Sequence, residues 1–348
     1  MVEQRHILVT GAAGFIGSHI VKDLLASGDR VRGTVRSLAK ADSYQHLLTL
    51  PGAQRLTLVE ADLNQAASFT EAVAGVDAVV HTASPYVLDV TDAQRDLVDP
   101  AVDGTRSVLA ACAHEPSVRR VVVTSSFAAV TDEPDGDHVL TESDWNAKST
   151  LTRNPYYYSK TLAERAAWDF MAAEPRGFDL VVINPFLTIG PALGPGLNTS
   201  NQVFVDLTTG TYPGILSLAF GLVDVRDVAS AHIQALRTDA ASGRYLCAGE
   251  VVPMRDLVGI MRRCLPPQVK LPTRSLDNAL GTQVVKLASY LQPRGVGSYL
   301  RSHVGRVPRY DTTRIRTELG VEFRPADQSV QDTVADLVAL GRISVPAA

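Results

Sequence analysis

The sequence predicts an α/β protein with a doubly wound parallel sheet and a smaller, mostly C-terminal part. Two observations carry this prediction. Short β-branched runs alternate with longer helical stretches through the first half of the chain, and three glycines follow the first run at intervals of three residues. Strands that alternate with helices build parallel sheets whose two faces are covered by those helices.

The alternating pattern gives the expected elements in order. The expected strands are His6–Thr10, Arg30–Val35, Leu56–Glu60, Ala78–Thr82, Arg120–Ser125 and Leu180–Asn184. The longer expected helices are Gly17–Ser27, Gln94–Glu115 and Tyr156–Glu174. Unbroken apolar runs such as that of Val121, Val122 and Val123 are typical of strands that are buried on both faces.

The sequence pattern changes after Pro185. Glycine and proline become frequent through residues 190–221, and the alternation of strands and helices is lost there. Helices are expected again near Val225–Leu236, Met254–Leu265 and Leu276–Leu291, with a short strand at Tyr245–Cys247 and Asp224 as the cap of the first helix. We therefore expect one domain of residues 1–187, rejoined by about 222–248, and a smaller part of residues 188–221 and 249–348.

Composition narrows the class of protein. The chain has 348 residues, a net charge of −4 and 45% hydrophobic residues, which is ordinary for a globular protein with a sizeable core. The absence of a basic block disfavours nucleic acid and membranes as partners, and no apolar run approaches the roughly 18–20 residues that span a bilayer. Three widely spaced cysteines suggest reduced thiols, no metal site and a cytoplasmic location.

The glycines lie where the first strand turns into the first helix. Gly11 suits the sharp turn, Gly14 allows a close approach to a pyrophosphate, and Gly17 allows the helix to pack on the strand. The free N–H groups at the start of that helix, near Phe15 and Ile16, favour an anion. The spacing G-x-x-G-x-x-G also occurs in purely structural turns, but its place at the first turn of a Rossmann-type pattern predicts a dinucleotide site.

The end of the second strand indicates which dinucleotide binds. An NAD site usually has an acidic residue there, whereas this chain has Arg32 and Arg36, followed by Lys40. A guanidinium can grip the 2′-phosphate of NADP(H) by paired, charge-assisted hydrogen bonds. The alternative is that these cations are only solvated surface charges. We favour the phosphate and expect Arg36 and Lys40 to bind it.

Residues after the third and fourth strands are further candidates for cofactor contact. Asp62 could accept a hydrogen bond from the adenine amino group, with Leu63 beside it. It could equally cap a helix expected to begin two residues later. The small residues Thr82, Ala83 and Ser84 let a cofactor lie close to the end of the fourth strand.

A pair of residues four apart carries the candidate chemistry. Tyr156 and Lys160 share one face of the expected helix, downstream of Ser126 at the end of the fifth strand. An adjacent ammonium favours the phenolate form of a tyrosine, and a phenol tuned in this way can donate a proton to a carbonyl oxygen. Lys160 can also hold the nicotinamide ribose, and Ser126 can stabilise the same oxygen. A lone Y-x-x-x-K is often structural, but here it accompanies the glycine turn and the basic second strand.

These motifs together resemble an extended short-chain dehydrogenase/reductase of the NAD-dependent epimerase/dehydratase superfamily. "TGAAGFIGSH", "YYYSK" with its upstream serine, and "NPFLTIGP" match in order and spacing, and "VRGTVRS", "SKTLAERAAW", "LNTSN" and "VDVRDVASAHI" resemble the dihydroflavonol, cinnamoyl-CoA and phenylacetaldehyde reductases. The resemblance implies NADP(H), a catalytic triad of Ser126, Tyr156 and Lys160, and a place for Pro185 near the nicotinamide carboxamide.

The expected substrate pocket lies over Ser126 and Tyr156. Its candidate walls are Phe127, Thr131, Phe186 and the segment Leu197–Phe204, including Asn201. Phe127 is bulkier than the residue usual at its position in the plant enzymes, and Thr131 also differs from theirs. We therefore expect the substrate to be a different aldehyde or ketone. We expect the enzyme to be a monomer or a homodimer.

Two other functions are weighed against this one. Nucleotide-sugar epimerases and dehydratases share the triad, but they usually read R-x-x-N-x-Y-G-P where this chain has "INPFLTIGP". A redox sensor that binds NADP(H) without catalysis typically loses the tyrosine or the lysine, and this chain retains both.

Overall fold

The main sheet of the protein is parallel throughout. A computed structural model describes residues 4–84, 92–134, 136–173 and 177–346. Its largest sheet has seven strands in the order β11-β7-β5-β4-β1-β2-β3, and all the neighbouring pairs are parallel. The bounds are β1 His6–Thr10, β2 Arg30–Val35, β3 Leu56–Glu60, β4 Ala78–His81, β5 Arg120–Thr124, β7 Asp179–Pro185 and β11 Gly243–Cys247. The chain reverses its direction of winding between β1 and β4, which defines the doubly wound, Rossmann-type fold.

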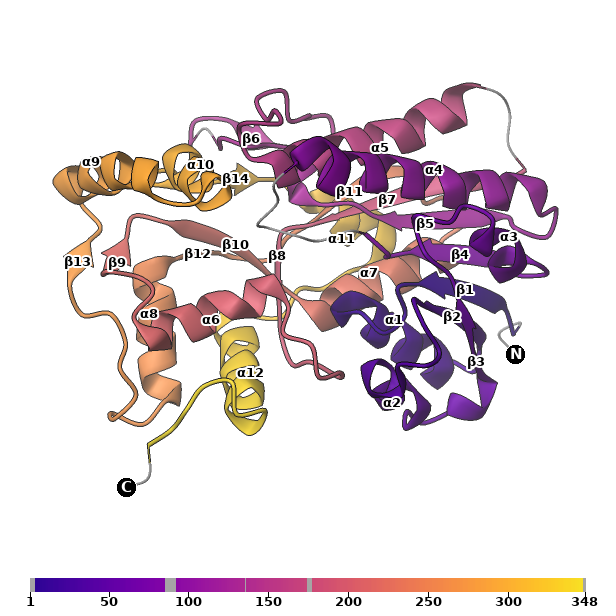
Figure 1. The fold of residues 1–348 in the computed structure, drawn as a ribbon, viewed down its shortest axis with the longest axis horizontal. Coiled ribbons are helices and arrows are strands. Elements are labelled where there is room, and N and C mark those ends of the chain that lie inside the picture. Colours follow the sequence, from indigo (N-terminus) through magenta and orange to yellow (C-terminus); the bar gives the residue numbers. More distant parts are fainter. Residues whose placement is uncertain (1–3, 85–91, 135, 174–176, 347–348) are drawn as a thin grey trace.

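Helices cover both faces of this sheet (Figure 1). Alternate strand residues point to opposite faces: Ile7 and Val9 join one core cluster, and Leu8 joins another. The first cluster is completed by α1 Phe15–Ala26, α2 Gln45–Leu48, α7 Val225–Arg237 and α11 Thr313–Leu319. The second is completed by α3 Ser68–Val73, α4 Asp99–His114 and α5 Pro155–Ala173.

The sequence predicted most of this sheet. The first three strands have the expected bounds, and the next two end one residue earlier, before Thr82 and Ser125. The helix expected at Gln94–Glu115 begins as a π-helical turn, Gln94–Val98, and continues as α4. The helix expected to reach Glu174 ends at Ala173 in the described part of the chain, and Glu174 itself lies outside the described residues.

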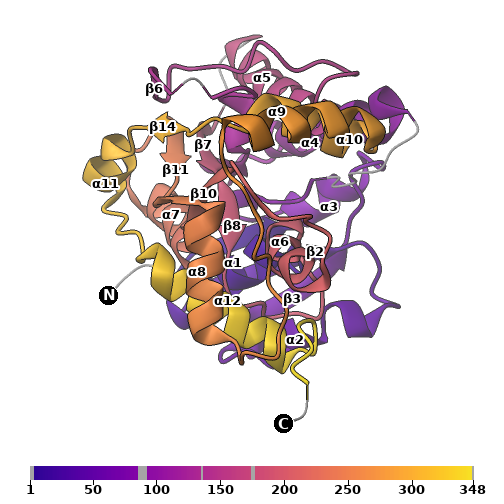
Figure 2. The same cartoon turned by 90° about the vertical axis from the view of Figure 1, so that its left-hand side faces the viewer.

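A smaller part lies beside the carboxyl ends of the strands (Figure 1) and faces the viewer in Figure 2. It holds a three-stranded sheet, β12-β10-β8, and two short strand pairs, β13-β9 and β14-β6. The strands are β6 Val139–Leu140, β8 Leu187–Ile189, β9 Ile215–Leu216, β10 Ala219–Asp224, β12 Val251–Pro253, β13 Ser275–Leu276 and β14 Arg309–Tyr310. The helices are α6 Thr199–Thr209, α8 Met254–Cys264, α9 Ala279–Ala288, α10 Arg294–His303 and α12 Ala326–Ala339.

The glycine- and proline-rich stretch is more regular than expected. It contains α6, an 11-residue helix that begins after Asn198 and ends at a left-handed Gly210. Of the glycines in this stretch, Gly190 and Gly210 have positive φ angles, and Gly210 ends α6. Asp224 caps α7 as expected, because its Oδ1 accepts a hydrogen bond from the Arg226 amide over 2.9 Å. Within the described ranges, none of the helices has the length and hydropathy that crossing a membrane requires.

Candidate active site

The glycine turn between β1 and α1 brings the backbone of Gly11 close to the start of the helix. Gly11 has a φ of +65°, which favours glycine. A Cβ on Gly17 would lie 2.3 Å from the Gly11 carbonyl oxygen, whereas a Cβ on Gly14 would meet only that same oxygen, at 3.1 Å. Gly14 is the N-cap of α1, so no side chain caps the first N–H groups of this helix. The turn therefore fits the pyrophosphate of a dinucleotide, which would be held by the backbone around Phe15 and Ile16.

The cations in and after β2 divide into two groups. The Arg32 guanidinium donates to the carbonyls of Ala72 and Ala74, at 2.9 and 2.8 Å, and so binds the C-terminal end of α3. Arg32 is thus engaged by the protein itself. Arg36 and Lys40 are exposed beyond the end of β2, on the side of the glycine turn.

The residues directly after β3 form a local turn that precedes α3. Asp62 Oδ1 accepts from the amide of Asn64 over 2.9 Å, but α3 begins only at Ser68. The expectation that Asp62 caps a helix starting at Asn64 is therefore wrong: it closes a local turn that precedes the helix. Leu63 packs close to Gly104 of α4.

The end of β4 is joined to the end of β1. Thr82 Oγ1 donates to the Thr10 carbonyl over 2.6 Å, and the Ala83 amide donates to Thr10 Oγ1 over 3.1 Å. The Ala83 Cα lies only 3.0 Å from the position a Cβ on Gly11 would take. The small residues Thr82 and Ala83 therefore let the end of β4 lie close to the glycine turn after β1.

Tyr156 and Lys160 lie in the first turns of α5. Lys160 Nζ is 5.9 Å from the centroid of the Tyr156 ring. It also donates a hydrogen bond to Ser84 Oγ over 2.8 Å. Because Ser84 follows directly on the strand-end residues that meet the glycine turn, this bond brings the tyrosine–lysine face of α5 to the same edge of the sheet.

The charge of Lys160 is set by two opposing effects. The side chain is buried, and this desolvation lowers its pKa to about 8, although the Glu164 carboxylate raises it. His81, at the end of β4, is also buried, and desolvation together with the charge of Lys160 lowers the pKa of His81 to about 3. His81 is therefore a neutral, hydrogen-bonded residue, with its Nδ1 2.8 Å from Thr10 Oγ1.

Ser126 follows β5 and caps a single 3₁₀ turn, Phe127–Ala129. Its backbone is extended, and its Oγ accepts from the Ala128 amide over 3.1 Å. The turn packs on α5, where Thr161 Oγ1 lies 3.5 Å from the Ala128 carbonyl. Ser126 is half-buried, as is Tyr156.

The candidate pocket residues differ in how far their side chains are exposed. Phe127 is only 3% exposed, and its ring packs on those of Phe186 and Tyr310, with centroids 4.1 and 5.5 Å away. Asn201 is 1% exposed, and its Nδ2 donates to the Gly190 carbonyl over 2.8 Å. Both side chains are buried and contact other parts of the protein, so their place in the substrate pocket stays a prediction. Thr131 and Phe186 are half-buried.

Pro185 ends β7 and is buried beside Asn184. Three further residues near Ser126 are not evident from the sequence. Asn184 donates to the Ser126 carbonyl and to Glu164, and Arg244 donates to Glu164. The signal that could have found Glu164 is its spacing, since a residue four after Lys160 falls on the same face of the helix.

The fold and this site define an extended short-chain dehydrogenase/reductase. The chain belongs to the NAD dependent epimerase/dehydratase family, whose model matches residues 7–248. It is 40% identical over 345 residues to cinnamoyl-CoA reductase 1 of Petunia hybrida, covering 98% of this chain and 94% of that one.

Solved structures give the same result. Gre2 of Candida albicans, in complex with NADPH, has a TM-score of 0.79 and 33% identity over 97% of this chain and 99% of that chain. Yeast methylglyoxal/isovaleraldehyde reductase Gre2, also with NADPH, has a TM-score of 0.79 and 28% identity over 97% and 100%. The chain is accordingly an NAD(P)-dependent reductase of the group that includes these proteins.

Proposed function

We propose that this enzyme is an NADPH-dependent carbonyl reductase that converts an aldehyde or ketone to the alcohol. Supplied with NADP⁺, it would run in reverse as an alcohol dehydrogenase. The observation that carries the proposal is a chain of contacts. Lys160 binds Ser84, the neighbouring Thr82 and Ala83 bind Thr10, and Thr10 leads into the glycine turn. A candidate proton donor and a dinucleotide cradle therefore meet at one edge of the sheet.

The roles of the three polar residues follow from their chemistry. NADPH, when bound, supplies a hydride to the carbonyl carbon. Tyr156 donates its phenolic proton to the carbonyl oxygen, and the Lys160 ammonium stabilises the phenolate that remains. Ser126 donates a hydrogen bond to the same oxygen as negative charge develops on it. The half-buried ring of Phe186 favours a mid-sized, partly apolar or aromatic substrate.

Preference for NADPH rests on the end of β2. Arg36 and Lys40 are exposed there, and Arg32 is held by α3, so Arg36 is the guanidinium proposed to bind the 2′-phosphate. The two NADPH complexes among the related structures support this choice.

The test is consumption of NADPH with a panel of carbonyl compounds. The panel includes isovaleraldehyde, methylglyoxal, an aromatic aldehyde and a cinnamoyl thioester, and nicotinamide absorbance is followed with each. We expect absorbance to fall with at least one of them and to fall more slowly with NADH. A nucleotide-sugar epimerase would change its sugar without net loss of NADPH, and a redox sensor would bind NADPH without turnover, so either result would replace the proposal.

A further inference from the structure

A buried carboxylate lies one helical turn beyond Lys160. The side chain of Glu164 is fully buried. Its Oε1 accepts from Arg244 Nε over 2.5 Å and from Trp168 Nε1 over 3.4 Å. Its Oε2 accepts from Ser125 Oγ over 2.5 Å and from Asn184 Nδ2 over 2.6 Å. Each oxygen therefore has two donors, which fixes the carboxylate from α5, β7, β11 and the end of β5 at once.

The carboxylate is connected to Ser126 through a single side chain. Asn184 Nδ2, which donates to Glu164, also lies 3.2 Å from the carbonyl oxygen of Ser126 and donates to it. Ser125, the residue before Ser126, donates by its hydroxyl to Glu164. Its amide donates to the Ile183 carbonyl over 2.8 Å. The residue before Ser126 and the peptide group after it are thus held, and they constrain the backbone from which the Ser126 Oγ projects.

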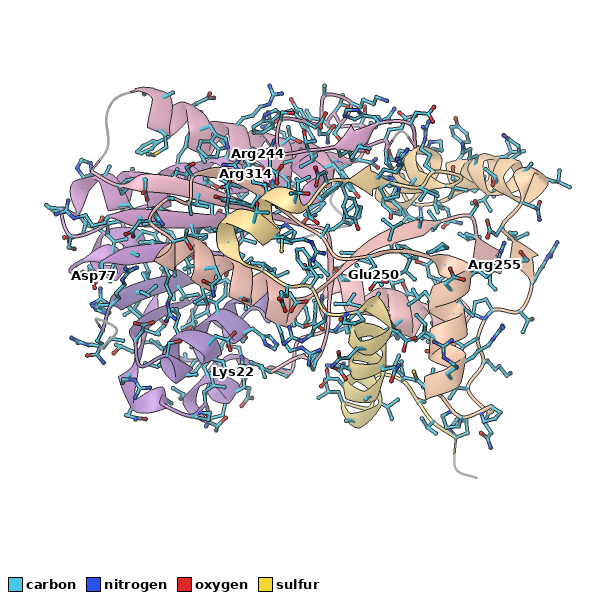
Figure 3. The ribbon with its side chains drawn as sticks, turned by 180° about the vertical axis from the view of Figure 1, so that it is seen from behind. Lys22, Asp77, Arg244, Glu250, Arg255 and Arg314 are labelled. Carbon is cyan, nitrogen blue, oxygen red and sulfur yellow. The ribbon has the colours of Figure 1, made fainter. Side chains whose placement is uncertain are left out.

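Arg244 also holds the Glu164 carboxylate in place. Its side chain is 7% exposed, and its Nη1 donates to the carbonyls of Glu142 and Asp144, at 2.8 and 2.7 Å. Its guanidinium lies 3.9 Å from the centroid of the Trp145 ring. Figure 3 shows Arg244 next to Arg314, which donates to the Arg244 carbonyl over 3.1 Å. A buried arginine with this many partners has little freedom to leave its carboxylate.

The same carboxylate acts on Lys160 by its charge. The negative charge of Glu164 favours the ammonium form of Lys160 and opposes the desolvation that lowers the pKa of this lysine. Other described residues near Lys160 are Tyr156 on α5, Ser84 after β4 and the neutral His81 of β4. Glu164 is the carboxylate among these groups.

We propose that Glu164, held by Arg244, is a positioning residue for the reaction: it fixes the orientation of Ser126 through Asn184 and Ser125, and it carries a negative charge one helical turn beyond Lys160. This inference rests on the proposed carbonyl reduction. A purely structural ion pair would affect stability alone. A positioning pair also changes the rate of the chemical step and its pH dependence.

The experiment compares Glu164→Gln and Arg244→Lys with a control at a more exposed carboxylate, Asp179→Asn. Asp179 also accepts hydrogen bonds from a largely buried arginine, Arg120, and also joins β5 to β7, but it lies at the amino ends of these strands. Each variant is assayed for kcat, for KM of the best carbonyl substrate and for NADPH binding, with melting temperature as a check on folding. The chain's two tryptophans both contact the pair, so their emission reports its integrity.

We expect Glu164→Gln to lower kcat by about tenfold or more, since small errors in the placement of catalytic groups are costly. KM and NADPH binding should change much less. The fall in activity at alkaline pH should begin at a lower pH, because Lys160 loses the charge that favours its protonated form. Arg244→Lys should lower kcat and shift the tryptophan emission. Asp179→Asn should keep the wild-type kcat and pH profile.

The outcomes separate the two proposals. Wild-type protein that consumes no NADPH with any carbonyl overturns the proposed function. An active wild type together with a Glu164→Gln variant of unchanged kcat and pH profile overturns this inference and leaves the function standing. Should Glu164→Gln fail to fold, Asn184→Ala decides, because it leaves the Glu164–Arg244 pair in place and removes the side chain that bridges Glu164 Oε2 and the Ser126 carbonyl. A normal kcat in that variant contradicts positioning, and a fall of about tenfold supports it.

Discussion

Lys160 Nζ donates a hydrogen bond to Ser84 Oγ over 2.8 Å, inside a part of the protein where its side chain is only slightly exposed. Burial lowers the pKa of this lysine to about 8 from an ordinary value of 10.5. Since the folded protein holds this proton less tightly than the unfolded chain does, the charged lysine destabilises the fold at every pH below about 8. The cost is about 3 kcal/mol and disappears as the pH rises towards 10.5.

Replacement of Lys160 should therefore separate stability from activity. We expect Lys160→Met to abolish turnover and to raise the melting temperature of the cofactor-free protein at pH 7. The gain should shrink as the pH rises through 8, because the wild-type lysine then loses its charge. Lys270→Met is the control, since Lys270 is exposed. A Lys160→Met protein that is less stable than the wild type at all pH values would contradict this account.

Cofactor preference should depend on Arg36. We expect Arg36→Asp to weaken NADPH binding by about ten- to a hundredfold, because a hydrogen bond to a charged group contributes about 1.5–3 kcal/mol. NADH binding should change little or improve. Dissociation constants for both cofactors check this, with Arg30→Asp as the control, since Arg30 is exposed at the opposite end of β2. Equal use of the two cofactors by the wild type would exclude this role for Arg36.

Repeating local patterns explain why the sheet could be predicted from the sequence. Runs such as Val121–Val123 must be strands buried on both faces, and the glycine turn has few other uses at the first turn of such a sheet. The helix α6 was missed, because its flanking glycines hide a helix that tertiary packing of Phe204 and Leu207 stabilises.

Side-chain partners that are distant in the sequence explain the other differences. The sequence does not show that the rings of Phe186 and Tyr310 lie against Phe127. Nor does it show that the Gly190 carbonyl accepts a hydrogen bond from Asn201. Glu164 reads as one more charge on a helix, since Arg244, 80 residues later, is what allows it to be buried.

The two phenylalanines near Ser126 should have different roles. Phe186 is half-buried, and its ring lies against the backbone of Gly221, where a Cβ would come within 2.6 Å of it. We expect Phe186→Ala to change the ranking of carbonyl substrates by size. Phe127→Ala empties a buried site and should cost about 3–5 kcal/mol of unfolding free energy. Substrate panels and denaturant melts of both variants check this. A change of ranking in the Phe127 variant at unchanged stability would reverse the assignment.

The three adjacent tyrosines offer the sharpest test of the mechanism. Consecutive helical residues point about 100° apart, so Tyr156, Tyr157 and Tyr158 face three directions. The Tyr157 hydroxyl lies 3.5 Å from His303 Nε2, and its ring packs near those of Tyr299 and His303, so Tyr157 is directed at α10.

We expect Tyr156→Phe to lower turnover by about a hundredfold or more, because it removes the general acid. NADPH binding should survive, since the phenol contributes little to it. Tyr157→Phe and Tyr158→Phe should each keep turnover within about tenfold of the wild type, a smaller loss than removal of the acid causes. Single-turnover hydride transfer at saturating NADPH measures the chemical step directly in all three variants. Near-normal transfer in Tyr156→Phe would overturn the mechanism, and a collapse confined to Tyr157→Phe would assign the acid to Tyr157, with His303 as its partner.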